Sequence, residues 1–179
     1  MKINEMKSNT KNIEDIETIS KSFSISINDL RQTAFNLVPE TLLKLGLELA
    51  LKDLCHSLIT SKISILFSST QIKKSISETN QITIFRIVQE LINNSLKHSN
   101  CTEIIVDCSQ NENLFLITVE DNGTGFNTSD IEYFKGLGLK NIKNRVDLLN
   151  GKLEIKSNSN KGTVFNIELK IQIANEQNI

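Results

Sequence analysis

Hydrophobic residues recur at alternating steps of four and three along the first part of the chain, and this spacing predicts long helices. The first series runs from Ile16 to Leu37, and its heptad pattern favours packing against another helix over packing within a globule. Pro39 ends this helix, because the residue before a proline is pushed out of the α region. A second, leucine-rich helix is predicted over residues 41–60.

The rest of the chain combines strand patterns with two further helices. Residues 62–68 alternate apolar and polar side chains, which predicts a half-buried strand, and Ser77 is a candidate N-cap for the helix that carries residues 89–99. The other strand patterns span 103–109, 114–120, 152–158 and 163–173. The last predicted helix has a buried stripe formed by Leu139, Ile142, Val146 and Leu149. A mixed sheet with its helices on one face would bury all these stripes, so we expect an α+β fold, a two-layer sandwich.

Length and composition indicate one ordinary globular domain with a helical appendage. The 179 residues are 39% hydrophobic and 23% charged, and the net charge of −1 gives no electrostatic reason to expect nucleic acid or an anionic membrane as a partner. Three cysteines without a CxxC pair argue against a disulfide framework or a zinc site. With no signal peptide or membrane span visible, we expect a cytoplasmic chain, or the cytoplasmic part of a membrane-associated protein.

Three polar side chains project together from one flank of the helix that carries residues 89–99. Glu90, Asn94 and Lys97 are spaced four and three residues apart, so they fall within roughly 60° of one another around the helix axis. Along that axis Glu90 and Lys97 lie about 10 Å apart, the reach of a metal-bound triphosphate. The alternative is the solvated flank of an ordinary amphipathic helix, and this helix alone favours the alternative.

Two glycine-containing motifs follow. Asp121 ends a strand and is followed by Gly123 and Gly125, which gives an acceptor at the sheet edge and a backbone that can approach a planar ligand closely. A plain Asp-Asn-Gly turn has the same sequence. Gly136 and Gly138 directly precede a helix N-terminus, where free N–H groups and the helix dipole can receive phosphate. A simple helix-start loop is the alternative there.

In their order along the chain, these motifs resemble the nucleotide-binding boxes of the GHKL ATPases, which include histidine kinases and gyrase. QELINNSLKHS resembles the N box, DNGTGF the first glycine box, KGLGLKNIKNRV the second, and KGTVFNIEL the closing Gly-Thr segment. The residues of these motifs are most similar to those in the catalytic domain of bacterial sensor histidine kinases of the NarL/DesK type. The similarity extends from about Asp29 to Ile171.

The resemblance implies a division of the chain into four parts. Residues 1–12 would be a disordered terminus and residues 13–60 a helical dimerisation remnant with its linking helix. Residues 61–173 would form the ATP-binding catalytic domain, with the Bergerat-type fold, and residues 174–179 a loose tail.

The resemblance also implies roles for individual residues, with ATP and Mg²⁺ as cofactors. Glu90 would polarise the attacking group or a metal-bound water, Asn94 would ligate Mg²⁺, and Lys97 would hold phosphate. Asp121 would accept a hydrogen bond from the adenine amino group, and Thr163 would sit beneath the adenine. The other expected nucleotide-binding residues are Gly123 and Gly125 at the adenine, Gly136 and Gly138 in the lid over the phosphates, and His98 and Leu139.

One departure from that family concerns the phosphoacceptor. Such a kinase carries its acceptor histidine upstream of the region that starts at Asp29, whereas the two histidines here are His56 and His98. The sequence therefore predicts the catalytic module of a two-component histidine kinase that acts on the dimerisation helix of another chain and, through it, on a response regulator. A homodimer is compatible with this. The alternatives are a non-catalytic ATP-dependent interaction module and a serine kinase that restrains a sigma factor; the heptad helix disfavours the latter.

Overall fold

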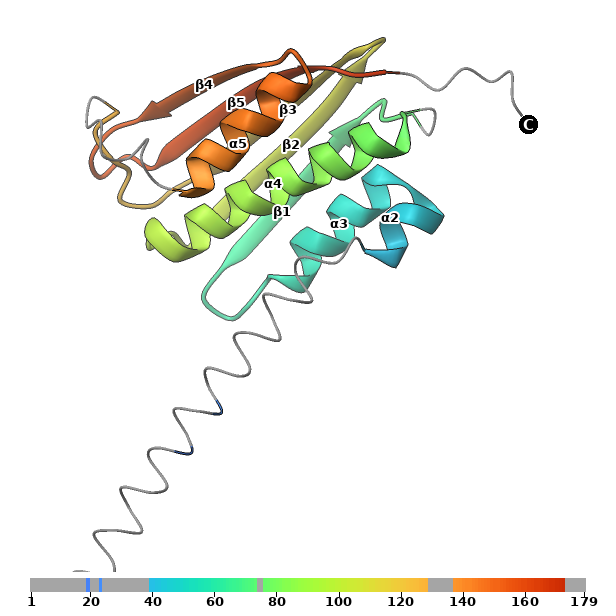
Figure 1. The fold of residues 1–179 in the computed structure, drawn as a ribbon. Coiled ribbons are helices and arrows are strands. Elements are labelled where there is room, and N and C mark those ends of the chain that lie inside the picture. Colours follow the sequence, from blue (N-terminus) through green and yellow to red (C-terminus); the bar gives the residue numbers. More distant parts are fainter. Residues whose placement is uncertain (1–18, 20–22, 24–38, 74–75, 129–136, 173–179) are drawn as a thin grey trace, which may run out of the picture. The chain divides into compact units, whose positions relative to one another are not determined.

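The computed structural model describes residues 19, 23, 39–73, 76–128 and 137–172. Most of the predicted heptad helix and the two predicted termini lie outside these residues. A compact unit begins at Pro39. Its helices are α2 (Glu40–Leu45), α3 (Leu47–Ser57), α4 (Glu78–His98) and α5 (Leu137–Leu148), and its strands are β1 (Ser64–Thr70), β2 (Glu103–Asn111), β3 (Leu114–Asp121), β4 (Lys152–Ser157) and β5 (Thr163–Lys170) (Figure 1).

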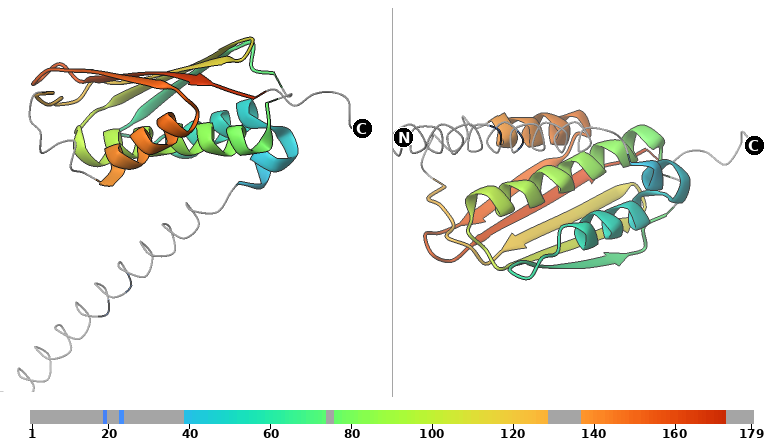
Figure 2. Two further views of the ribbon diagram at one scale, coloured as in Figure 1. Left: turned by 45° about the horizontal axis from the view of Figure 1, so that its top comes forward. Right: turned by 90° about the horizontal axis from the view of Figure 1, so that it is seen from below.

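Five strands form one mixed sheet in the order β1-β2-β3-β5-β4. β1 runs parallel to β2, and every other neighbouring pair is antiparallel. Helices α3, α4 and α5 lie side by side on one face of this sheet, as both views of Figure 2 show. The expected α+β fold, a mixed sheet with its helices on one face, is confirmed.

The core lies between the sheet and these helices. Strand residues alternate between the two faces, so that Val106, Val119 and Ile167 are buried against the helices. On α4, Val88 and Leu91 are fully buried in the stripe that the sequence predicts. Because this stripe fixes the rotation of α4 about its axis, it also fixes the direction of the polar flank. Although α4 has 21 residues, neither it nor another helix in the described residues is long and apolar enough to cross a membrane.

The helix predicted over residues 41–60 is interrupted at Gly46. There φ is +89°, a conformation that favours glycine, and α2 ends while α3 begins. The leucine pattern does not reveal this break, because both pieces bury their apolar faces, with Leu42 and Leu54 among the buried residues. Ser77 does precede α4, as predicted, but its side chain makes no capping hydrogen bond.

Candidate nucleotide-binding site

The second glycine motif meets the polar flank of α4. A Cβ atom added at Gly138 would lie 2.7 Å from Glu90 Oε1 and 3.1 Å from Asn94 Oδ1. The first turn of α5, the positive end of that helix, is therefore brought against these two side chains. Gly136, which the sequence analysis also assigns to the site, lies outside the described residues.

The side chain of Asn94 has an unused donor at this place. Its Nδ2 atom is buried and has no hydrogen-bond partner within the described parts of the chain. A buried donor left unpaired costs about 1–3 kcal/mol. A phosphate oxygen would satisfy Nδ2, while Oδ1 is the type of oxygen that Mg²⁺ accepts as a ligand. The residues present therefore fit a magnesium-bound phosphate group.

Asp121, the last residue of β3, is only 4% exposed, and both of its carboxylate oxygens are held by hydrogen bonds. The Gly123 N–H donates to Oδ1 at 2.9 Å, and the Ser95 hydroxyl donates to Oδ2 at 2.9 Å. Ser95 follows Asn94 directly, so the carboxylate of Asp121 contacts the residue next to the one that carries the unused amide. Each carboxylate oxygen has further lone-pair capacity, so Asp121 can also accept from an amino group of a ligand.

The loop that follows Asp121 is held between α4 and the β4–β5 turn. The Thr124 N–H donates to the Ser99 carbonyl at 2.7 Å. A Cβ atom at Gly123 would lie 2.2 Å from that same carbonyl oxygen, and Gly125 has a φ of +58°. Neither position accommodates a side chain without moving the loop, which explains why glycines stand there.

Thr163, the first residue of β5, lies directly across from Asp121 in the antiparallel register of β3 and β5. It is 3% exposed, and its hydroxyl oxygen lies 2.9 Å from that of Ser157. The sequence analysis did not identify Ser95 or Ser157 as parts of the site. Ser95 carried one signal: a polar residue on the buried arc of a helix needs a hydrogen-bond partner.

Three other residues assigned from the sequence lie nearby, and their roles stay predictions. Lys97 and His98 are exposed in the last turn of α4. Leu139 is half-buried in the first turn of α5.

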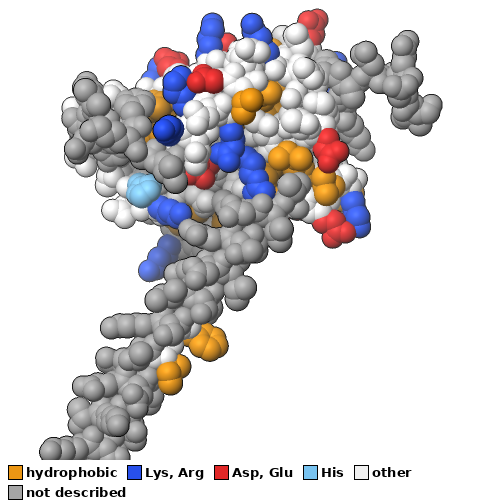
Figure 3. Space-filling model, in the orientation of Figure 1, with side chains coloured by type: hydrophobic (Ala, Val, Ile, Leu, Met, Phe, Trp, Pro, Cys, Tyr) orange, Lys and Arg blue, Asp and Glu red, His pale blue; other side chains and the backbone are white. Residues whose placement is uncertain are grey.

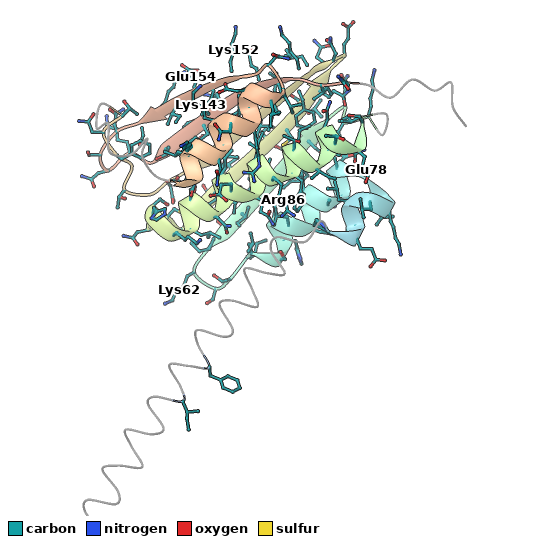
Figure 4. The ribbon with its side chains drawn as sticks, viewed as in Figure 1. Lys62, Glu78, Arg86, Lys143, Lys152 and Glu154 are labelled. Atoms are coloured by element: carbon teal, nitrogen blue, oxygen red, sulfur yellow. The ribbon has the colours of Figure 1, made fainter. Side chains whose placement is uncertain are left out.

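Basic side chains also lie on the face that carries α4 and α5, shown in Figure 3, and Figure 4 labels Arg86 on α4 and Lys143 on α5. Burial and the neighbouring Arg145 guanidinium lower the pKa of Arg86. Arg86 precedes Asn94 by eight residues, which is about 12 Å along the helix. Lys143 forms an exposed ion pair with Asp147 at 3.4 Å. The start of α5, at Gly138, lies against Glu90 and Asn94, whereas Arg145 near its end lies beside Arg86, so α5 runs antiparallel to α4 and Arg145 lies away from Asn94.

The mixed sheet covered by helices on one face, together with these motifs, is typical of one family of ATPase domains. Residues 79–173 match the family described as histidine kinase-, DNA gyrase B-, and HSP90-like ATPases. The chain belongs to this family, as its motifs predict. The ATPase domain implies ATP binding.

Known relatives come from the histidine kinases. The sensor histidine kinase ComP of Bacillus subtilis is 30% identical over 155 residues, which are 86% of this chain and 20% of ComP. The oxygen sensor histidine kinase NreB of Staphylococcus carnosus is 30% identical over 168 residues, 93% of this chain and 47% of NreB. The chain thus spans a fifth and about half of the length of these two relatives. Its fold is shared by the histidine kinase domain of a blue-light activated histidine kinase from Erythrobacter litoralis, with a TM-score of 0.57 and 20% identity over 67% of this chain and 57% of that one.

Proposed function

We propose that this chain binds Mg·ATP between α4 and the glycine motifs, and that it transfers the γ-phosphoryl group to a histidine of another chain. The observation that carries this proposal is the juxtaposition on α4. Asn94 offers an unpaired buried amide donor, and the next residue, Ser95, holds the carboxylate of Asp121. Two consecutive residues of α4 would therefore serve both ends of a nucleotide. Asn94 would bind the phosphates, and Ser95 would hold Asp121, which binds the base.

Phosphoryl transfer asks mainly for positioning and charge neutralisation. Asp121 accepts a hydrogen bond from the adenine amino group, and Asn94 would hold Mg²⁺ through Oδ1 and a phosphate oxygen through Nδ2. Mg²⁺ held there would supply positive charge that offsets the negative charge developing on the phosphate oxygens during transfer. Lys97, on the same flank, neutralises phosphate charge. Glu90 accepts a ring proton of the attacking histidine as the P–N bond forms and the P–O bond to the departing ADP breaks.

The partners that we propose follow from the relatives. ComP and NreB are both sensor histidine kinases by name, which favours a two-component role over a purely interacting module or a kinase of sigma-factor regulators. The partners would be the histidine-bearing dimerisation helix of another chain and, downstream, a response regulator. Of the two histidines in the chain, His56 is exposed on α3 and His98 ends α4. Neither lies upstream of Asp29, where this type of kinase carries its acceptor, and we therefore propose a histidine outside the given residues as the acceptor.

A transfer assay tests this function. We expect ATP labelled in its γ-phosphate to pass label to a separately prepared helical fragment that carries an acceptor histidine, as an acid-labile and alkali-stable phosphoramidate. The Glu90→Gln variant should bind ATP as the parent chain does and transfer no label, because it lacks the proton acceptor. ATP binding without transfer by the parent chain would instead support the interaction module. Acid-stable label on serine would support the sigma-factor kinase.

The Gly138→Ala variant is expected to separate phosphoryl transfer from stability. Alanine raises helix propensity by about 1 kcal/mol relative to glycine, so α5 should be no less stable. The new Cβ atom would lie 2.7 Å from Glu90 Oε1 and would displace that carboxylate. We expect transfer to slow by about tenfold or more, since small misplacements of a reacting group are costly. Asn141→Ala, one turn further along α5, is the matched control. An unchanged transfer rate for Gly138→Ala would show that Glu90 takes no part in phosphoryl transfer.

A further inference from the structure

Ser157, the last residue of β4, is a buried serine beside the base end of the proposed site. It is 7% exposed and lies outside all of the motifs described above. Its hydroxyl oxygen lies 2.9 Å from the Phe126 amide nitrogen, 3.0 Å from the Gly162 carbonyl oxygen and 2.9 Å from the Thr163 hydroxyl oxygen. These contacts join the first glycine motif, the β4–β5 turn and the start of β5 at one atom.

The chemistry of its partners fixes the direction of each hydrogen bond around Ser157. A hydroxyl group has one proton to donate and two lone pairs to accept with. The Gly162 carbonyl can only accept, so it takes the Ser157 proton, and the Phe126 N–H can only donate, so it occupies one lone pair. The second lone pair is left for Thr163, which therefore donates its hydroxyl proton to Ser157.

The consequence concerns what Thr163 presents to a ligand. With its proton turned to Ser157, the Thr163 oxygen offers only lone pairs on its remaining sides. Its direct cross-strand partner is Asp121. Side chains paired in this way have Cβ atoms about 4.5–5.5 Å apart. The carboxylate of Asp121, which receives hydrogen bonds from Ser95 and Gly123, likewise has no proton and can only accept. Together Asp121 and Thr163 form a surface of hydrogen-bond acceptors.

We propose that Ser157 is a specificity-determining positioning residue, which holds the Thr163 proton and thereby makes the base site select an exocyclic amino group over an exocyclic carbonyl. The amino group of adenine donates to Asp121 and reaches Thr163 directly or through one water. The carbonyl of hypoxanthine or guanine would meet lone pairs and remain unpaired, and sites built in this way discriminate strongly. This inference rests on the proposed ATP site.

The experiment compares ATP with inosine triphosphate by calorimetric titration of the full chain. The parent chain should bind ATP more tightly. In Ser157→Ala the Thr163 hydroxyl is free to turn and donate to the inosine carbonyl. We therefore expect the ratio of the two dissociation constants to fall about tenfold, the equivalent of one hydrogen bond. If Ser157 only supported the loop, both constants would change by the same factor. An unchanged ratio would therefore overturn the inference.

Two further variants keep the result interpretable. Thr163→Val removes the hydroxyl itself, so the ratio should fall in this variant too, and adding Ser157→Ala to it should cause no additional change. Ser68→Ala is the matched control, since Ser68 lies on β1, at the opposite edge of the sheet, and its hydroxyl binds Asp107. A parent chain that binds neither nucleotide would refute the proposed function. A parent chain that prefers ATP, with a ratio that Ser157→Ala leaves unchanged, would refute only the role of Ser157.

Discussion

The Asp121→Asn variant is expected to bind ATP about 5- to 150-fold more weakly while its fold persists. The amide keeps the shape of the carboxylate but replaces one acceptor oxygen with an NH₂ group. In the orientation that leaves the Gly123 N–H bonded to an oxygen, this NH₂ group takes the place of Oδ2 beside Ser95, where we propose that the adenine amino group binds. The Ser95 hydroxyl can rotate and accept from it, so the fold loses little. The adenine amino group cannot rotate away, and it would meet a donor. Calorimetric titration with ATP measures the loss.

The matched control for this variant is Glu120→Gln, the same chemical change one residue earlier. Glu120 is exposed and, because strand residues alternate, it points to the sheet face opposite Asp121. We expect unchanged ATP affinity and an unchanged unfolding temperature for Glu120→Gln. Equal ATP affinity for the Asp121→Asn variant and the parent chain would show that Asp121 does not bind the adenine base. A large drop in unfolding temperature would show that the carboxylate mainly supports the fold.

The fold could be predicted because the burial of each element follows a simple period. The stripe through Val88 and Leu91 predicts both α4 and its rotation, and therefore which flank stays polar. The alternation of apolar and polar residues from Phe165 to Lys170 in β5 predicts which face of that strand is covered. The break at Gly46 could not be predicted in this way, because a single residue with positive φ leaves the hydrophobic pattern intact.

The placement of the candidate site residues could be predicted only where local spacing or the end of a strand determines it. Glu90 and Asn94 share a flank through helix geometry, and Asp121 is placed by the end of its strand. The partners of Ser95 and Ser157 depend instead on which distant segments meet: Ser95 binds the end of β3, and Ser157 binds the loop that follows it. Serine occurs in many environments, so its sequence position alone does not predict such contacts. Only the arrangement of the sheet and α4 brings them together.

The Asn94→Ala variant is expected to lose the metal-dependent part of its ATP affinity. Alanine removes both the oxygen proposed to ligate Mg²⁺ and the buried Nδ2 donor proposed for a phosphate oxygen. A hydrogen bond to a charged group is worth about 1.5–3 kcal/mol, so we expect binding with Mg²⁺ to weaken about 10- to 150-fold. Titration with ATP in magnesium and again in excess chelator separates the two contributions. The difference between the two conditions should be much smaller in Asn94→Ala than in the parent chain.

The stability of the nucleotide-free Asn94→Ala variant should move in the opposite direction. Because the unpaired Nδ2 costs about 1–3 kcal/mol in the parent chain, its removal offsets the packing that is lost. We therefore expect an unfolding temperature at least equal to that of the parent chain, a trade of stability for binding. Asn93→Ala is the matched control, a half-buried asparagine about 100° around the same helix, for which we expect unchanged ATP affinity. An equal loss of affinity with and without magnesium would contradict the metal role, and a lower unfolding temperature would show that Asn94 is retained for the fold.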